Sequence, residues 1–153
     1  ILSVFDNTFR GKISKIQKQI TASGHTLDEL LTMASILEKE ASKTKDRQQI
    51  AGVLWQRIKV GMPLQVDAVF PYIMGKNTFE LTLNDLQFNS PYNTYKYKGL
   101  PPGPINNPGL DSILAAATPI KSKYVYFLSD KQGNFHYAVT YAQHLANKKK
   151  YID

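Results

Sequence analysis

Hydrophobic residues recur three and four positions apart through about the first sixty residues, a spacing that predicts amphipathic helices. We expect three in succession, over about residues 3–22, 27–41 and 44–59. The second begins at Thr26-Leu27-Asp28-Glu29, which has the pattern of a capping box, in which the Thr and Glu side chains bond backbone N–H groups. Gly61 ends the third helix, as glycine commonly does just past a helix C-terminus.

The hydrophobic pattern becomes irregular in the middle of the chain. An extended piece at residues 64–67 leads to a short helix over 69–74, and residues 82–86 suit one more helical turn. Residues 89–109 are rich in Asn, Pro, Gly and Tyr, the composition of a loop. A loop of about 20 residues is unusual in a compact domain, and when it is ordered it often carries function. A short helix follows at 110–117.

Strand-forming residues are concentrated near the C-terminus. Two runs rich in aromatic and β-branched residues, 124–128 and 135–139, flank a turn that contains Gly133 and predict a β-hairpin. Thr140 is placed to cap a last amphipathic helix that continues into the final lysines. Helices, then a loop and a hairpin, then a helix indicate an α+β fold.

Composition limits the class of protein further. Without repeats or an internal boundary, residues 1–153 predict one domain, in which 1–25 form a leading helix. There is no cysteine, which excludes disulfides and thiolate metal sites, and no run of about 18 apolar residues that could span a membrane. The net charge of +7 suggests an anionic neighbour, although many of the lysines lie near the two ends, as on solvated helix faces.

The second helix ends in two carboxylates whose roles the pattern leaves open. On a helical wheel its apolar stripe centres near Leu30, Leu37 and Ala41, and Glu38 and Glu40 lie about 80° to either side. A glutamate at the edge of a stripe is commonly a solvated residue, but it can also be a buried acid. Periodicity does not rank the two residues.

The loop adds a possible ligand surface. Tyr92, Asn93, Tyr95 and Tyr97 precede the proline-stiffened segment Gly99–Pro104. Carbohydrate sites use such groups, because the C–H faces of sugars pack on aromatic rings while amides and carboxylates bond the hydroxyls. The same tyrosines could instead fold back on the core, and the residues alone do not decide between the two.

Other kinds of site lack their characteristic residues. The three histidines are not at metal-ligand spacing, and there is neither a phosphate-binding glycine loop nor a Gly-x-Ser-x-Gly motif. Basic residues are not interleaved with aromatic ones as in nucleic-acid-binding surfaces. We therefore expect no metal, no cofactor and no nucleic-acid partner.

Four segments, in order, carry distinctive sequences. Met33-Ala-Ser-Ile-Leu-Glu-Lys-Glu40 is the first, and Ile50–Asp67 is the second. The third is Tyr92-Asn-Thr-Tyr95, and the fourth is Gly99-Leu-Pro-Pro-Gly-Pro-Ile with Asn-Pro-Gly109 after it. Together these segments resemble the YceG-like family of endolytic murein transglycosylases. One departure is that Ala-Val-Phe-Pro follows Asp67, where the family commonly has Pro-Thr-Val.

The resemblance implies a reaction on peptidoglycan glycan strands. The family cleaves the β-1,4 bond between N-acetylmuramic acid and N-acetylglucosamine without water and leaves 1,6-anhydro ends. A single glutamate acts as acid and then as base, and the family signature places this role on Glu40. The candidates for substrate contact are Glu38, Gln65, Asp67, Tyr92, Asn93 and Tyr95.

The resemblance also implies a setting. Full-length relatives carry an N-terminal membrane anchor and a LysM-like module, so we expect this chain to be a catalytic fragment of an enzyme of the cytoplasmic (inner) membrane. Its catalytic domain would face the periplasm or cell wall. Cell-wall synthases are possible partners, and contact with the membrane would come only through the anchor.

Two other interpretations of the chain are open. One is a non-catalytic glycan-binding or scaffold module of the cell-wall machinery. The other is an aminodeoxychorismate lyase, a label that proteins of this family have carried, which would require pyridoxal phosphate and a Schiff-base lysine. Lys39 lies on the polar side of the second helix, and no phosphate-binding loop accompanies it.

Overall fold

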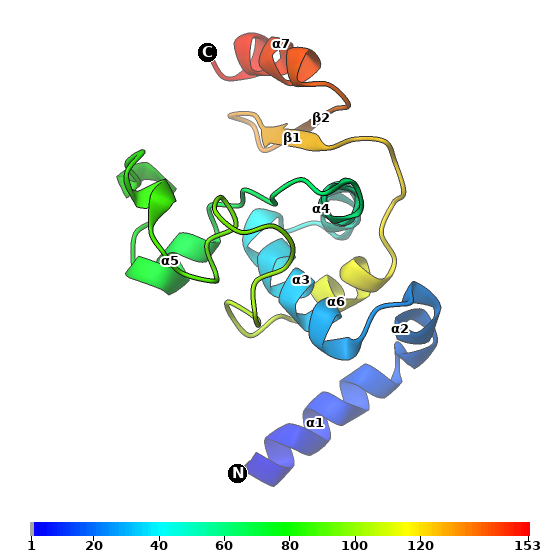
Figure 1. Ribbon diagram of the computed structural model, residues 1–153. Helices are drawn as coiled ribbons and strands as arrows, with labels where there is room; N and C mark the ends of the chain where they lie inside the picture. The colour runs from blue at the N-terminus through cyan, green and yellow to red at the C-terminus, as the bar shows by residue number, and fades with distance from the viewer. Residues whose placement is uncertain (1) are drawn as a thin grey trace.

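The computed structural model describes residues 2–153, with side chains from Asn7 onward, and these residues form helices around a core with one β-hairpin at the edge (Figure 1). The elements in chain order are α1 (Leu2–Ser14), α2 (Gln17–Ser23), α3 (Leu27–Glu40), α4 (Thr44–Val60), α5 (Val69–Met74), the 3₁₀ turns η1 (Thr78–Glu80) and η2 (Asp85–Gln87), α6 (Leu110–Ala117), β1 (Tyr126–Ser129), β2 (Phe135–Ala138) and α7 (Tyr141–Tyr151). The predicted α+β class is confirmed.

Helix α3 is the centre of the core. Leu30, Met33, Ile36 and Leu37 are fully buried on it, and it packs against both α4 and α6. Its start is fixed by the predicted capping box, in which Thr26 and Glu29 exchange side-chain to backbone hydrogen bonds. A helix buried on most of its surface has little freedom to shift along its axis, so its last turn is held in a defined place.

Helix α4 approaches the following segment very closely at Gly52. A Cβ atom at this glycine would lie 2.0 Å from the carbonyl oxygen of Ile120, so only glycine fits there. At the other end of α4, Gly61 adopts the left-handed backbone (φ 79°) that closes the helix, as predicted.

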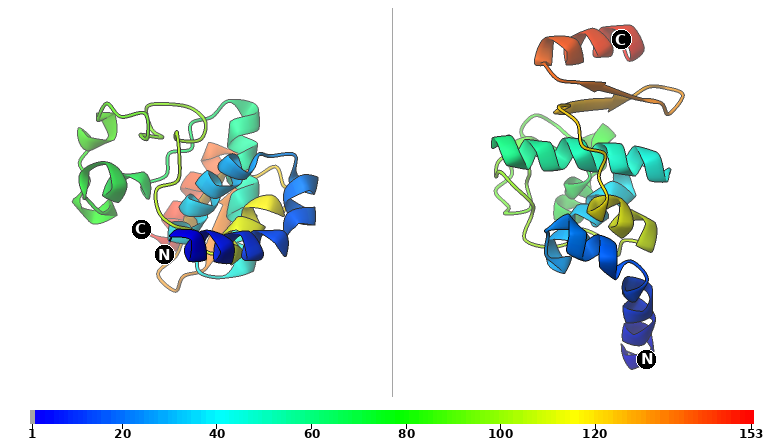
Figure 2. Two further views of the ribbon diagram at one scale, coloured as in Figure 1. Left: turned by 90° about the horizontal axis from the view of Figure 1, so that it is seen from below. Right: turned by 90° about the vertical axis from the view of Figure 1, so that its right-hand side faces the viewer.

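The leading helix predicted over residues 3–22 is wrong in one respect, because it is two helices. The chain bends at Lys15 and Ile16, whose N–H groups bond the carbonyls three residues back, at Lys12 and Ile13. The bend lets Ile13, Ile16 and Ile20 all reach the core, whereas α1 extends away from the rest of the molecule (Figure 2). The apolar spacing continues unbroken through the bend, so it gives no sign of it.

The hairpin and α7 stack as two further layers over α4 (Figures 1 and 2). β1 and β2 pair antiparallel with Tyr126 opposite Ala138 and Ser129 opposite Phe135. Thr140 caps α7 through a capping box with Gln143, as its position predicted. In consequence the inner face of the hairpin lies close to the end of α3.

The segment after Asp67 accommodates its unusual sequence. α5 begins at Val69, and the N–H of Phe70 bonds the carbonyl of Asp67. Pro71 lies in the first turn of the helix, where a missing N–H costs nothing, and Phe70 fills the core. The displaced proline is therefore compatible with a regular short helix.

Candidate active site

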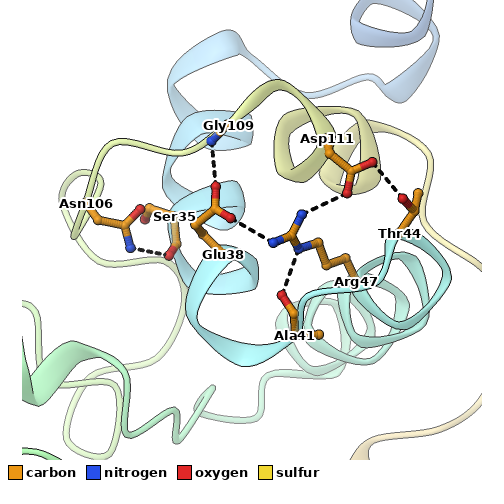
Figure 3. A network of polar contacts seen from close by, with 8 residues as sticks. All are labelled: Ser35, Glu38, Ala41, Thr44, Arg47, Asn106, Gly109 and Asp111. Atoms are coloured by element: carbon orange, nitrogen blue, oxygen red, sulfur yellow. Dashed lines mark hydrogen bonds and ion pairs between the residues drawn. The ribbon is translucent and has the colours of Figure 1, made fainter.

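The two glutamates at the end of α3 have different surroundings, and those of Glu38 are structural (Figure 3). One carboxylate oxygen of Glu38 accepts from Arg47 at 2.8 Å, and the other accepts from the backbone N–H of Gly109 at 2.6 Å. Arg47 in turn pairs with Asp111 at 2.8 Å and donates to the carbonyl of Ala41. Glu38 therefore ties α3 to α4 and to the start of α6.

Ser35 anchors the proline-rich segment to the same helix. Its hydroxyl accepts from the N–H of Ile105 at 3.0 Å. Its carbonyl accepts from the side-chain amide of Asn106 at 2.7 Å (Figure 3). Gly109, three residues beyond Asn106, is held by Glu38. Ser35 and Glu38 thus fix the loop against α3, and residues 107–109 of the loop line a separate cavity against α1.

The side chain of Glu40, in contrast, makes no hydrogen bond or ion pair with any residue that the structure describes. Its side chain is partly buried and opens into a cleft of about 460 Å³ that Gln65, Asp67 and Tyr95 also line. Burial and then the negative charge of Asp67 raise the pKa of Glu40 to about 7. The C-terminal end of α3 acts in the same direction, because its carbonyls disfavour an anion.

Hydrogen bonds between the segment at residues 64–67 and the turn at residues 94–96 bring the three other cleft residues together. The N–H of Gln65 donates to the carbonyl of Thr94, and the buried Thr94 hydroxyl accepts from the N–H of Val66. Gln65 has a left-handed backbone (φ 53°), which is rare for a residue with a side chain, and its side chain is exposed between buried neighbours. Such strain is frequently found at functional sites, and here it directs Gln65 toward the cleft.

Tyr95 and Asp67 form a hydrogen-bonded pair on the cleft wall. The Tyr95 hydroxyl donates to a carboxylate oxygen of Asp67. Burial, and next this hydrogen bond, raise the pKa of Tyr95 above its ordinary range, so the phenol keeps its proton. The pair therefore presents an oriented carboxylate beside Glu40.

The cleft continues past Glu40 to its other side. Lys39 and Glu40 also line a second depression, whose walls include Asp46 from α4 and Phe135 from the hairpin. On the first side Phe127, from β1, contributes an aromatic wall. Glu40 therefore lies between two open depressions, an arrangement that suits a long ligand passing over it.

Four of the predicted site residues, Glu40, Gln65, Asp67 and Tyr95, line one cleft. The structure places the others elsewhere. Asn93 is fully buried, where its amide donates to the carbonyls of Leu86 and Phe88 and its oxygen accepts from the N–H of Tyr95.

Tyr92 packs against Tyr72 of α5, away from the cleft, with ring centroids 4.8 Å apart. Glu38 lines only the second depression, and its carboxylate oxygens are already hydrogen-bonded. Tyr92, Asn93 and Glu38 therefore stabilise the fold around the cleft in this structure. Neither Tyr92 nor Asn93 lines this cleft, and their contact with substrate stays a prediction.

Several lining residues had no signal in the sequence. Phe127, Asn77 and Thr78 reach the cleft from the hairpin and from η1, and Phe135 reaches the second depression. These segments are far from α3 along the chain, so only the fold brings them to Glu40.

The fold and the site define a helix-rich α+β domain with an elongated open cleft. One acid in this cleft, Glu40, has a side chain without a partner among the described residues. The chain belongs to the YceG-like family, whose model matches residues 1–150. It is 45% identical over 127 residues to the endolytic murein transglycosylase of Bacillus subtilis, covering 83% of this chain and 35% of that protein. It is 37% identical over 147 residues to the endolytic murein transglycosylase of Streptococcus pneumoniae, covering 92% of this chain and 27% of that protein.

A solved structure has the same fold. The crystal structure of a YceG-like protein from Listeria monocytogenes superposes with a TM-score of 0.80 at 42% identity, covering 88% of this chain and 44% of that one. The chain therefore spans about a third or less of the length of the curated relatives named above, which are larger proteins. No helix within residues 2–153 has both the length and the apolar character to cross a membrane.

Proposed function

We propose that this domain is a lytic transglycosylase that cleaves peptidoglycan glycan strands internally, with Glu40 as the single catalytic acid and base. The observation that carries the proposal is the state of Glu40, which has no partner among the described residues and a pKa raised to about 7 in a cleft open on both sides. The relatives from Bacillus subtilis and Streptococcus pneumoniae are endolytic murein transglycosylases, which supports the substrate class.

The chemistry needs one proton donor that becomes an acceptor. Glu40 gives its proton to the glycosidic oxygen as the bond from the muramyl anomeric carbon to that oxygen breaks. The resulting carboxylate takes the proton of the muramyl C6 hydroxyl, whose oxygen bonds to the anomeric carbon and closes the 1,6-anhydro ring. Glu40 is thereby protonated again, with the proton of the C6 hydroxyl, and no water is consumed.

The other cleft residues have distinct roles in this proposal. Asp67, oriented by Tyr95, places negative charge where positive charge develops on the sugar ring. Gln65 offers its amide to sugar hydroxyls, and Phe127 offers a flat face for sugar C–H groups. Asn93 and Glu38 hold the loop and α3 in place.

The site of action follows from the substrate. We propose that the domain works on the outer side of the cytoplasmic membrane, at the cell wall. A membrane anchor, a LysM-like module and cell-wall synthases as partners are part of the same proposal, and they rest on the resemblance alone.

Product analysis separates this proposal from a non-catalytic glycan-binding module. Purified glycan strands incubated with the domain are expected to gain 1,6-anhydromuramyl ends, detected by mass spectrometry. New reducing muramyl ends would identify a hydrolase instead. Binding of strands without any new ends would identify the binding module.

Activity is expected to depend on pH through the proton on Glu40. Because the pKa is about 7, the protonated fraction and hence kcat/KM should fall about tenfold for each pH unit above neutrality. Replacing Asp67 with Asn removes the neighbouring charge that helps raise this pKa, so the alkaline limb should move to lower pH. Initial rates of anhydro-end formation across the pH range measure both effects, and an unmoved limb in the variant would contradict the role of Asp67.

A further inference from the structure

A second cavity, of about 310 Å³, opens beside the cleft. It shares Gln65, Tyr95 and Phe127 with the cleft, so the two are neighbours across one wall. Its remaining walls carry three basic side chains, Arg57, His144 and Lys148, together with aromatic rings from β1 and α7. We call this cavity the basic pocket.

Arg57 is a buried cation without a carboxylate partner in the described part of the chain. Its Nε donates to the carbonyl of Val125 at 2.6 Å, and its Nη1 donates to the carbonyls of Pro63 and Leu64. The guanidinium lies over the ring of Tyr126, 5.3 Å from its centroid. Nη2 has no hydrogen bond to any of the described residues, so one arm of the fork is left for another acceptor.

Lys148 adds to this positive charge from α7, and His144 lies one turn before it on the same helix. Burial and then the charges of Lys148 and Arg57 lower the pKa of His144, which indicates that the three groups converge. The ring of His144 stacks on Tyr126 with centroids 5.0 Å apart. No Asp or Glu is among the described residues that line this pocket. The pocket therefore lacks an anion that would neutralise its charge.

We propose that the basic pocket binds a carboxylate of the peptide stem attached to the muramyl residue in the cleft. This inference rests on the proposed function. The sugars of a glycan strand are neutral, and in peptidoglycan the negative charges lie on the stem peptides that branch from them. A guanidinium fork beside an ammonium and tyrosine hydroxyls is chemically matched to a carboxylate.

The position of the pocket suits the peptide stem that branches from the glycan strand rather than the sugars of the strand. In the proposed mode of binding the strand passes over Glu40, which lines both depressions, whereas the basic pocket meets the cleft through Gln65, Tyr95 and Phe127 and is not lined by Glu40. A group that leaves the strand next to these two residues can enter the pocket without displacing the sugars. The pocket then favours strands that still carry their peptides.

The test measures kcat/KM for anhydro-end formation on two substrates, strands with intact peptide stems and strands from which an amidase has removed them, with the lactyl carboxyls thus exposed capped as neutral methylamides. Wild type is expected to prefer the stem-bearing strands. Lys148→Glu should reduce this preference, expressed as the ratio of the two kcat/KM values, by about tenfold, as for loss of a charge-assisted contact. Lys149→Glu makes the same charge change on the next residue of α7, outside the pocket, and should leave the ratio unchanged within about twofold.

Three outcomes would overturn the inference. An equal ratio in wild type and Lys148→Glu would show that the pocket does not bind the stem, and an equal fall in Lys149→Glu would show a general charge effect. Stem-free strands that carry wall-polymer phosphates form a third substrate, and a Lys148→Glu effect confined to these would assign the pocket to phosphate. Cleavage of neither substrate by wild type would instead reject the proposed function.

Discussion

Replacing Glu40 with Gln is expected to lower the rate of anhydro-end formation by about 10³-fold, because the amide can neither give a proton to the glycosidic oxygen nor take one from the C6 hydroxyl. The side chain keeps its size, and the carboxyl of Glu40 has no hydrogen bond in the described structure that the change would break. The variant should therefore fold and still bind glycan strands. Mass spectrometry of digested strands measures the loss.

Stability provides an independent check on the same variant. The pKa of Glu40 is about 7 in the folded state and lies near its ordinary value of 4.5 when the chain is unfolded. The folded state therefore holds a proton that the unfolded state has lost, and wild type becomes less stable as pH rises between these values. The amide that replaces Glu40 does not titrate, so the melting temperature of Glu40→Gln relative to wild type should rise from pH 4 to pH 8.

Glu38→Gln is the matched control, since it makes the same change two residues earlier. Both carboxylate oxygens of Glu38 are hydrogen-bonded, one to Arg47 and the other to Gly109, and Glu38 has no part in the proposed chemistry. This variant should therefore lose stability while keeping most of its activity per folded molecule. If Glu38→Gln abolished cleavage and Glu40→Gln did not, the assignment of the catalytic acid would be reversed.

The difference between these two glutamates shows where the sequence pattern reaches its limit. Both lie about 80° from the apolar stripe, so a helical wheel treats them alike. What distinguishes Glu38 from Glu40 is its contacts with Arg47, nine residues further along the chain, and with Gly109, 71 residues further along. Long-range contacts of this kind leave no trace in local periodicity, and the ranking of Glu40 came from the family resemblance.

Local signals were reliable where a local cause exists. The capping box at Thr26, the left-handed glycine at Gly61 and the cap at Thr140 all mark helix ends as predicted, because each acts through neighbouring backbone groups. The bend at Ile16 has no such marker. The helix from Val69 to Met74 has the bounds that the sequence predicts.

Composition left two roles open for the tyrosine- and proline-rich loop, a sugar surface or tyrosines folded back on the core, and the structure divides its residues between them. Of Tyr92, Asn93 and Tyr95, only Tyr95 lines the cleft, while Tyr92 packs on Tyr72 and Asn93 is buried under the loop. Composition marks a loop as unusual, but it cannot tell which side chains face inward. The aromatic walls come instead from Phe127 and Phe135 of the hairpin, which the sequence indicates only as strand residues.

Replacing Arg47 with Met is expected to lower the free energy of unfolding by about 3 kcal/mol, the largest loss of stability we expect from a change outside the apolar core. Arg47 is mostly buried and pairs with Glu38 and Asp111, so its removal leaves two carboxylates facing each other without a cation. Both acids are partly exposed, and solvent screening keeps the loss at the low end for a broken buried pair. Thermal unfolding should show a melting temperature lower by about 6–12 °C.

Lys45→Met is the control for this effect, because it makes the same kind of change on the same helix at an exposed position. It should shift the melting temperature little. Adding Glu38→Gln to Arg47→Met removes one of the stranded charges, so the double variant should be more stable than the sum of the two single changes predicts. Strict additivity would mean that Arg47 stabilises the fold through its bond to the Ala41 carbonyl and its packing, and not through the ion pair with Glu38.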